Sequence, residues 1–165
     1  MIIFDSSTLI LLAKAGLLDD FLRDYQGKFF VPLAVEAESC SRKKTFDSLL
    51  LRKRIEEGKI KVAKVVDNQL CEQLMQDFNL ARGEAETLVL AIEKKAKLVA
   101  TDDRNAIKAC RVLKLSYASA INILIRMAGR GAIEADRLES SLSALLKCGR
   151  YSDEIIHDAK KKLQI

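Results

Sequence analysis

Short apolar runs that alternate with longer helical patterns constrain the fold of this chain more than any other feature. Residues 2–4, 29–31 and 97–100 are apolar runs too short for helices, and each precedes a helical pattern. Residues 59–65 alternate polar and apolar side chains, which predicts a half-buried or edge strand. Strands that alternate with helices favour right-handed crossovers and a parallel sheet covered on both faces.

We therefore expect an α/β protein, a three-layer α/β/α sandwich with a central parallel sheet, in a single domain spanning residues 1–165. The length suits one domain with a sizeable core. Pro32, the only proline, is expected to open a helix, because its missing N–H is not needed there. The other predictions are a last strand at 113–117, a helical C-terminal region at about 118–165, and helices at 5–18 (broken at Gly16), 32–42, 43–58, 67–77, 81–95 and 103–113.

Composition excludes several classes of protein. No apolar run approaches the roughly 20 residues of a membrane span, and Asp5 interrupts the start too early for a signal peptide, so we expect a cytosolic protein. The net charge of +5 fits a polyanionic partner, while 5% aromatic residues argue against base stacking, so phosphates would be the main contacts. Four scattered cysteines and one histidine argue against structural zinc. We expect the histidine, His157, to lie on the surface. We expect the cysteines to be small core residues, namely Cys40, Cys71, Cys110 and Cys148.

Acidic residues directly follow two of the predicted strands. Asp5 follows residues 2–4, and Asp102 and Asp103 follow residues 97–100. Adjacent aspartates repel, and a divalent cation is their natural counter-charge. If the two strands are neighbours, all three carboxylates lie at one edge of the sheet, where parallel sheets bind ligands. Each acid alone is explained as a helix N-cap, but two such positions on one edge favour a site.

Three glutamates extend this acidic set. Glu84 and Glu86 lie in the first turn of the helix predicted at 81–95, where acids also stabilise the helix dipole by roughly 0.3–1 kcal/mol. Glu38 lies three residues after Val35 and is expected on the inward side of its helix. An acid on that side is costly unless it is paired or ligates a metal. Glu36, on the other side, is expected to be solvated.

The ordered motifs resemble the signature of a PIN domain, the domain of a nuclease family that includes the VapC-type toxins. The resemblance covers nearly the whole chain, including Gly131-Ala132-Ile133 and Gly149-Arg150-Tyr151. Its main motifs are Asp5-Ser6-Ser7, Pro32-x-x-Val35-x-x-Glu38, Gly83-Glu84-x-Glu86 with Leu90-Ala91, and Thr101-Asp102-Asp103. Residues 117–120 depart from a glycine-bearing stretch of many relatives, a change that we expect to leave the chemistry untouched.

The resemblance implies an endoribonuclease that binds Mg²⁺ or Mn²⁺ and hydrolyses single-stranded RNA. It implies catalytic roles for five acids, namely Asp5, Glu38, Glu84, Asp102 and Asp103. We expect Asp5 and Asp103 to ligate the metal directly, and we expect three further acids to ligate it directly or through water, namely Asp102, Glu38 and Glu84. We expect Ser7, Thr101 and Glu86 to support these ligands. The resemblance also suggests a homodimer, and a toxin role would require an antitoxin partner.

Basic residues near the acids are candidate phosphate contacts. Arg82 and Arg104 flank the acids and are the preferred ones, ahead of Lys14, Arg42 and Lys43.

Three alternative functions compete with the nuclease. The first is a non-catalytic PIN-fold protein with a nucleic-acid-binding or regulatory role, although such a protein would not need the complete set of acids. The second is an Asp-x-Asp phosphatase, for which the second aspartate after Asp5 is missing. The third is an interaction protein whose acids are all helix caps.

Overall fold

A five-stranded parallel sheet forms the centre of the chain in the computed structural model, which describes residues 1–40 and 45–165. The strand order is β3-β2-β1-β4-β5, and every neighbouring pair is parallel. The strands are β1 (Ile2–Phe4), β2 (Phe29–Pro32), β3 (Ile60–Ala63), β4 (Leu98–Ala100) and β5 (Tyr117–Ala118). The predicted parallel sheet is therefore confirmed, with the alternating segment as its edge strand β3.

Several of the helices begin where the sequence places a capping side chain. Asp5, Asp67, Asp103, Ser119 and Ser152 each accept a hydrogen bond from a backbone N–H in the first turn of the helix that follows. The helices are α1 (Ser6–Lys14), α2 (Leu18–Asp24), α3 (Leu33–Cys40), α4 (Phe46–Glu56), α5 (Asn68–Phe78), α6 (Arg82–Glu93), α7 (Arg104–Val112), α8 (Ala120–Gly129), α9 (Ala135–Cys148) and α10 (Asp153–Leu163).

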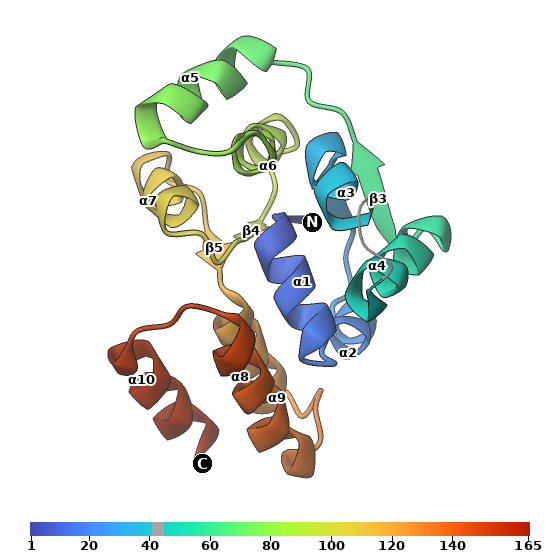
Figure 1. Cartoon of the computed structure of the whole chain (residues 1–165), viewed down its shortest axis with the longest axis vertical. Helices are drawn as coiled ribbons and strands as arrows, with labels where there is room; N and C mark the ends of the chain where they lie inside the picture. Colours follow the sequence, from blue (N-terminus) through green and yellow to red (C-terminus); the bar gives the residue numbers. More distant parts are fainter. Residues whose placement is uncertain (41–44) are drawn as a thin grey trace.

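The two faces of the sheet bury two separate cores, because successive residues of a strand point to opposite faces. Ile2 and Phe4 of β1 pack with apolar residues of α1, α2, α8 and α9 on one face. Ile3 of the same strand packs with α5, α6 and α7 on the other face. Figure 1 shows α5, α6 and α7 gathered at one end of the molecule and α8, α9 and α10 at the other. This arrangement confirms the three-layer sandwich.

An aromatic cluster stabilises the first of these cores. The ring of Phe4, which is fully buried, lies 6.0 Å from the ring of Phe21 and 5.8 Å from that of Phe29. Tyr25 extends the cluster, with its ring 5.3 Å from the ring of Phe29. These contacts join β1, β2 and α2 close to the middle of the sheet.

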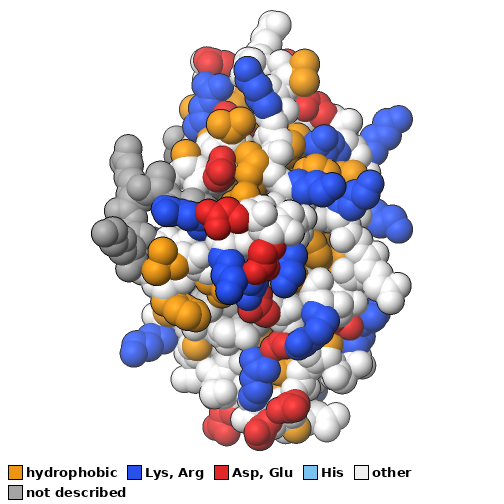
Figure 2. Space-filling model, turned by 90° about the vertical axis from the view of Figure 1, so that its right-hand side faces the viewer, with side chains coloured by type: hydrophobic (Ala, Val, Ile, Leu, Met, Phe, Trp, Pro, Cys, Tyr) orange, Lys and Arg blue, Asp and Glu red, His pale blue; other side chains and the backbone are white. Residues whose placement is uncertain are grey.

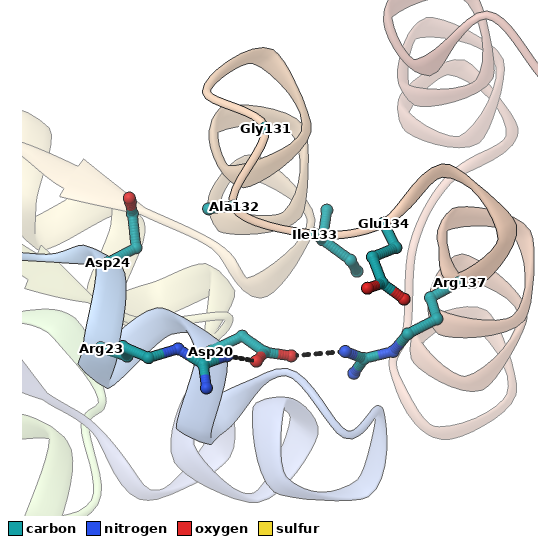
Figure 3. Close-up of a pocket in the computed structure, with 8 residues that line it drawn as sticks. All are labelled: Asp20, Arg23, Asp24, Gly131, Ala132, Ile133, Glu134 and Arg137. Atoms are coloured by element: carbon teal, nitrogen blue, oxygen red, sulfur yellow. Dashed lines mark hydrogen bonds and ion pairs between the residues drawn. The ribbon is translucent and has the colours of Figure 1, made fainter.

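Ion pairs fasten the C-terminal helices to the N-terminal part of the chain. Figure 3 shows Asp20 of α2 between the guanidinium groups of Arg23 and Arg137, in a cavity of about 440 Å³. The distance from Arg137 Nη1 to Asp20 Oδ2 is 2.7 Å. Arg130, just after α8, pairs with Asp24 at 3.1 Å. These charges are therefore engaged in joining α2 to the α8–α9 region.

The structure corrects three expectations about single residues. Pro32 ends β2 and α3 begins one residue later, because the strand continues its pairing with β3 as far as Ala63. The last strand is Tyr117–Ala118, because Lys114 adopts a left-handed φ of 56° and turns the chain there. Cys148 is exposed at the end of α9, whereas Cys71 and Cys110 are buried as predicted.

Some expectations fall outside what the structure describes. They are the helix end at Arg42, the helix start at residue 43, Arg42 and Lys43 as phosphate contacts, and the core position of the Cys40 thiol. The face in Figure 2 shows Lys and Arg side chains interspersed with Asp and Glu. Over residues 1–40 and 45–165, the helices all fall short of the length and apolar character that a bilayer crossing needs.

The aromatic cluster predicts a large and local loss of stability on truncation. Phe4→Ala should lower the free energy of unfolding by about 3–5 kcal/mol, because it leaves a cavity in the core. Phe46→Ala is the matched control, since the Phe46 side chain is 75% exposed, and it should change stability by less than about 0.5 kcal/mol. Thermal unfolding of both variants tests this, and equal effects would contradict the core position of Phe4.

Candidate metal centre

The candidate site lies where the connections of the sheet change direction. The chain runs from β1 to β2 and β3 on one side, whereas β4 and β5 lie on the other side of β1. Open parallel sheets bind ligands at such a point, beyond the carboxyl ends of the strands. Phe4 pairs with Ala100 at the ends of β1 and β4, and the Asp5 N–H donates to the Ala100 carbonyl at 2.9 Å. Asp5 and Thr101 are therefore the first residues past the sheet.

Asp5 is buried, with 2% of its surface exposed, and hydrogen bonds hold its carboxylate in place. Its Oδ1 accepts the backbone N–H of Ser6 at 2.7 Å, which caps α1. Its Oδ2 accepts the hydroxyls of Ser7 at 2.7 Å and of Thr101 at 3.1 Å. The structure thus places the two expected supporting hydroxyls against Asp5, and they orient the carboxylate as outer hydrogen bonds orient metal ligands.

Two further acids interact electrostatically with Asp5. Asp103 caps α7 by accepting the Ala106 N–H at 2.8 Å with Oδ1. Glu84 accepts the N–H of Ala81 at 2.8 Å, which satisfies a donor at the start of α6. Asp103 therefore has the capping role expected of it, and Glu84 lies in the first turn of α6 as expected. Both still lie in the electrostatic field of the other acids. The cap and site interpretations do not exclude one another.

The ionised forms of two of these acids are disfavoured. Burial raises the pKa of Asp5, against the lowering effect of its three hydrogen bonds, and the charge of Asp103 raises it further. Burial also raises the pKa of Glu84, and the negative charges of Asp103, Asp5 and Glu38 add to the effect. A bound cation would relieve both penalties. Asp5, Glu38, Glu84 and Asp103 are called the carboxylate cluster below.

Glu38 joins this cluster with a different side-chain orientation from the one predicted. The side chain is exposed and does not face the core, so the predicted inward orientation is wrong. Its Oε2 accepts the Ser6 hydroxyl at 3.0 Å, and a Cβ on Gly83 would lie only 2.9 Å from its Oε1. Because α3 packs against α6 at a residue without a side chain, Glu38 can lie beside the helix start of α6.

Asp102 is held apart from the cluster. Its Oδ2 accepts the Thr8 hydroxyl at 2.7 Å and the Ala120 N–H at 2.9 Å, and its Oδ1 accepts the Tyr151 hydroxyl at 2.7 Å. Asp102 is absent from the charges that raise the pKa of Asp5 and Glu84. It joins β4 to α8 and to the segment before α10. Residues 117–120 therefore contact the aspartate turn through Ala120, and their effect on the chemistry stays a prediction.

Glu86 also lies apart from the carboxylate cluster. It is 9% exposed and accepts the Arg82 Nε–H at 2.9 Å and the Ala34 N–H at 3.2 Å. Glu86 therefore joins the starts of α6 and α3, and supports Glu38 only through the placement of α3. Arg82 is engaged by this pair and by Glu72 at 3.7 Å, whereas Arg104 is exposed and is absent from the ion pairs of the described residues.

Four residues that shape the site had no role assigned from the sequence, although all but Thr8 belong to the quoted motifs: Ser6, Thr8, Gly83 and Tyr151. Ser6 lies next to Asp5, and Gly83 precedes Glu84, so both had a signal in their position. Thr8 and Tyr151 contact Asp102 from 94 and 49 residues away. No local pattern could indicate those contacts.

The donor set fits a hard cation that retains water. Asp103, Glu38 and Glu84 each keep one carboxylate oxygen without a hydrogen bond among the described residues, and the cluster contains only oxygen donors. Mg²⁺ prefers oxygen ligands and keeps several waters. Within residues 1–40 and 45–165, however, no three acidic, histidine or cysteine side chains are arranged to hold an ion directly. An ion would therefore be held partly through water.

Comparison with known proteins agrees with the ordered motifs. A family model described as DUF3368, PIN domain, matches residues 1–164 of the chain. No curated protein and no solved structure matches the chain significantly. The matched range includes every acid of the carboxylate cluster.

The raised pKa of Asp5 predicts the effect of removing its charge. Because the folded-state pKa exceeds the usual value of 3.8, the ionised residue disfavours folding as pH rises through that folded-state value. Without metal at pH 7, Asp5→Asn should leave the melting temperature unchanged or raise it. The rise should be about 2–4 °C for each kcal/mol gained in the free energy of unfolding. The gain should shrink toward pH 4. A large loss of stability at pH 7 would instead make Asp5 mainly structural.

Proposed function

The chain belongs to the PIN-domain family, and from this membership and the carboxylate cluster we propose that it is a Mg²⁺- or Mn²⁺-dependent endoribonuclease that hydrolyses single-stranded RNA. The observation that carries the proposal is the convergence of four acids from four separate segments at the β1–β4 edge. Helix capping explains Asp5, Glu84 and Asp103 singly, but it does not explain why Glu38 joins them. A cation shared by all four carboxylates would explain it.

We assign the metal to Asp5 and Asp103 directly and to Glu84 and Glu38 directly or through water. Of the two adjacent aspartates, Asp103 interacts with Asp5 and Glu84, while three donors engage Asp102 elsewhere. Asp102 therefore becomes a positioning residue for the turn that carries Asp103. Ser7 and Thr101 hold the Asp5 carboxylate in one orientation.

A bound divalent ion would supply a polarised phosphoryl oxygen and a water of lowered pKa. The chain's own contribution is to place oxygen ligands at an edge where RNA can approach. His157, on α10, is exposed and is not part of the carboxylate cluster, so the chain brings no imidazole to the proton transfer. The toxin role, its antitoxin partner and a homodimer stay predictions from the resemblance.

Replacing Asp103 tests the metal assignment with a matched control. Asp103→Asn should retain the cap of α7, because Asn caps helices as well as Asp, yet lose about 100-fold or more of Mn²⁺-dependent cleavage of single-stranded RNA. Asp67→Asn changes the same residue type in the same capping role at α5, and should cleave like the parent protein. Stabilisation by millimolar Mn²⁺ should disappear only in Asp103→Asn. Equal cleavage by both variants would contradict the assignment.

The close approach of Gly83 to Glu38 gives a second test. Gly83→Ala puts a Cβ 2.9 Å from Glu38 Oε1 and displaces that flexible carboxylate. Stability should change by less than about 1 kcal/mol, because Ala favours the helix. Cleavage should fall by about 10–100-fold because a ligand group is misplaced. Gly129→Ala is the control, since nothing lies within 4 Å of an added Cβ there. Undiminished cleavage by Gly83→Ala would exclude Glu38 from the site.

A further inference from the structure

A groove beside Asp102 is lined by arginines that have no acidic partner among the described residues. It has a volume of about 610 Å³ and lies between α7, the start of α8 and the start of α10. Asp102 forms part of its wall, so the groove begins at the residue next to Asp103. Its three arginines are Arg104 and Arg111 of α7 and Arg150 in the segment before α10.

The charges of these three arginines are not neutralised within the described part of the chain. Arg23, Arg54, Arg82, Arg130 and Arg137 all form ion pairs there. Arg104, Arg111 and Arg150 are exposed, and none of them has a carboxylate oxygen of the described residues within ion-pairing distance. Arg111 instead contacts the neutral Tyr117, with Nε 2.9 Å from the hydroxyl and the guanidinium 5.7 Å from the ring centre.

Two of the three acids that line the same groove are engaged by other groups of the chain. Three donors engage Asp102, and Asp158 pairs with Lys162 at 2.8 Å. Glu154 lies in the first turn of α10, where the helix dipole favours a negative charge. The groove therefore carries three acids as well as three arginines. Its arginines, unlike Asp102 and Asp158, face no charged or hydrogen-bonding partner among the described acids, so their guanidinium groups can bind an anionic ligand.

We propose that this groove binds the phosphate backbone of the single-stranded RNA on one side of the cleaved bond. The inference rests on the proposed function, because it takes single-stranded RNA as the substrate. It concerns how the RNA is bound, not how it is cleaved. Guanidinium groups match phosphate oxygens with paired hydrogen bonds. The hydroxyl of Ser119 and the amide of Asn122 line the groove as further polar groups.

Recognition in the groove is directed at phosphates and therefore tolerates many sequences. Phosphate contacts position a nucleic acid but carry no sequence information. Two aromatic residues line the groove, and both are engaged within the chain. Arg111 lies over the ring of Tyr117, and the Tyr151 hydroxyl donates to Asp102. Selection of a cleavage sequence must then come from other parts of the surface or from the shape of the RNA.

The test measures binding without cleavage. Fluorescence anisotropy of a labelled single-stranded oligoribonucleotide is recorded in EDTA over a range of salt concentrations. Combining Arg104→Gln, Arg111→Gln and Arg150→Gln should weaken binding about 10–100-fold and lower the salt slope by about 2, because each phosphate bound on a single strand contributes about 0.7 to that slope. The three side chains are exposed, so the melting temperature should stay close to that of the parent protein. If the triple variant unfolds, Arg150→Gln alone should still lower the slope by about 0.7.

Arg126→Gln is the matched control. Arg126 is also exposed and lies outside the described ion pairs, but it lines a different cavity, beside Tyr25 and Arg130. Equal weakening and an equal fall in the salt slope for Arg126→Gln and for Arg150→Gln, each of which removes one charge, would mean that only total charge matters, and would overturn the proposal. Absence of RNA binding by the parent protein would overturn it too, and would leave the groove to another occupant such as a peptide.

The outcomes for the groove and for the nuclease can be told apart. If the parent protein cleaves RNA with Mn²⁺ but the triple variant binds normally, the groove proposal fails and the proposed function stands. If the parent protein binds RNA without cleaving it, and the triple variant binds weakly, the groove proposal stands and the proposed function fails.

Discussion

The parallel pairing of β1 with β4 is the interaction on which the rest of the structure depends. It closes a separation of 96 residues and puts Asp5 and Thr101 in contact at the end of the sheet. Because β1 is the middle strand of the order β3-β2-β1-β4-β5, both cores pack against it. The chain must therefore form its most distant strand pairing to form either its core or its acidic edge.

At that edge the same side chains serve the fold and the site. Asp5, Glu84 and Asp103 satisfy backbone donors at helix starts, which stabilises the helices. Their mutual repulsion and the burial of Asp5 and Glu84 act in the opposite direction. The caps let a cluster of like charges persist without metal, and a cation would turn the remaining repulsion into binding energy. The neighbouring Asp102 has become a structural junction instead.

Much of the fold could be predicted from local patterns, because strand and helix periodicities and caps are local properties. The capping roles of Asp5 and Asp103 and the edge strand within residues 59–65 are examples. The errors came where tertiary contacts override local preference. Pro32 stays in its strand because β3 pairs with it. Glu38 lies beside the start of α6 because α3 meets α6 at Gly83. Glu86 contacts the start of α3 because its carboxylate accepts the Ala34 N–H.

By itself the sequence determined which acids follow the strands, and membership of the PIN-domain family agrees with those ordered motifs. The tertiary structure alone decided which acids meet. Two adjacent aspartates look equivalent along the chain, but the direction of each side chain depends on partners from distant segments. Tyr151, Thr8 and Ala120 draw Asp102 toward the C-terminal helices, while Asp103 stays with Asp5 and Glu84. Such a division depends on contacts between distant segments, which residue order cannot specify.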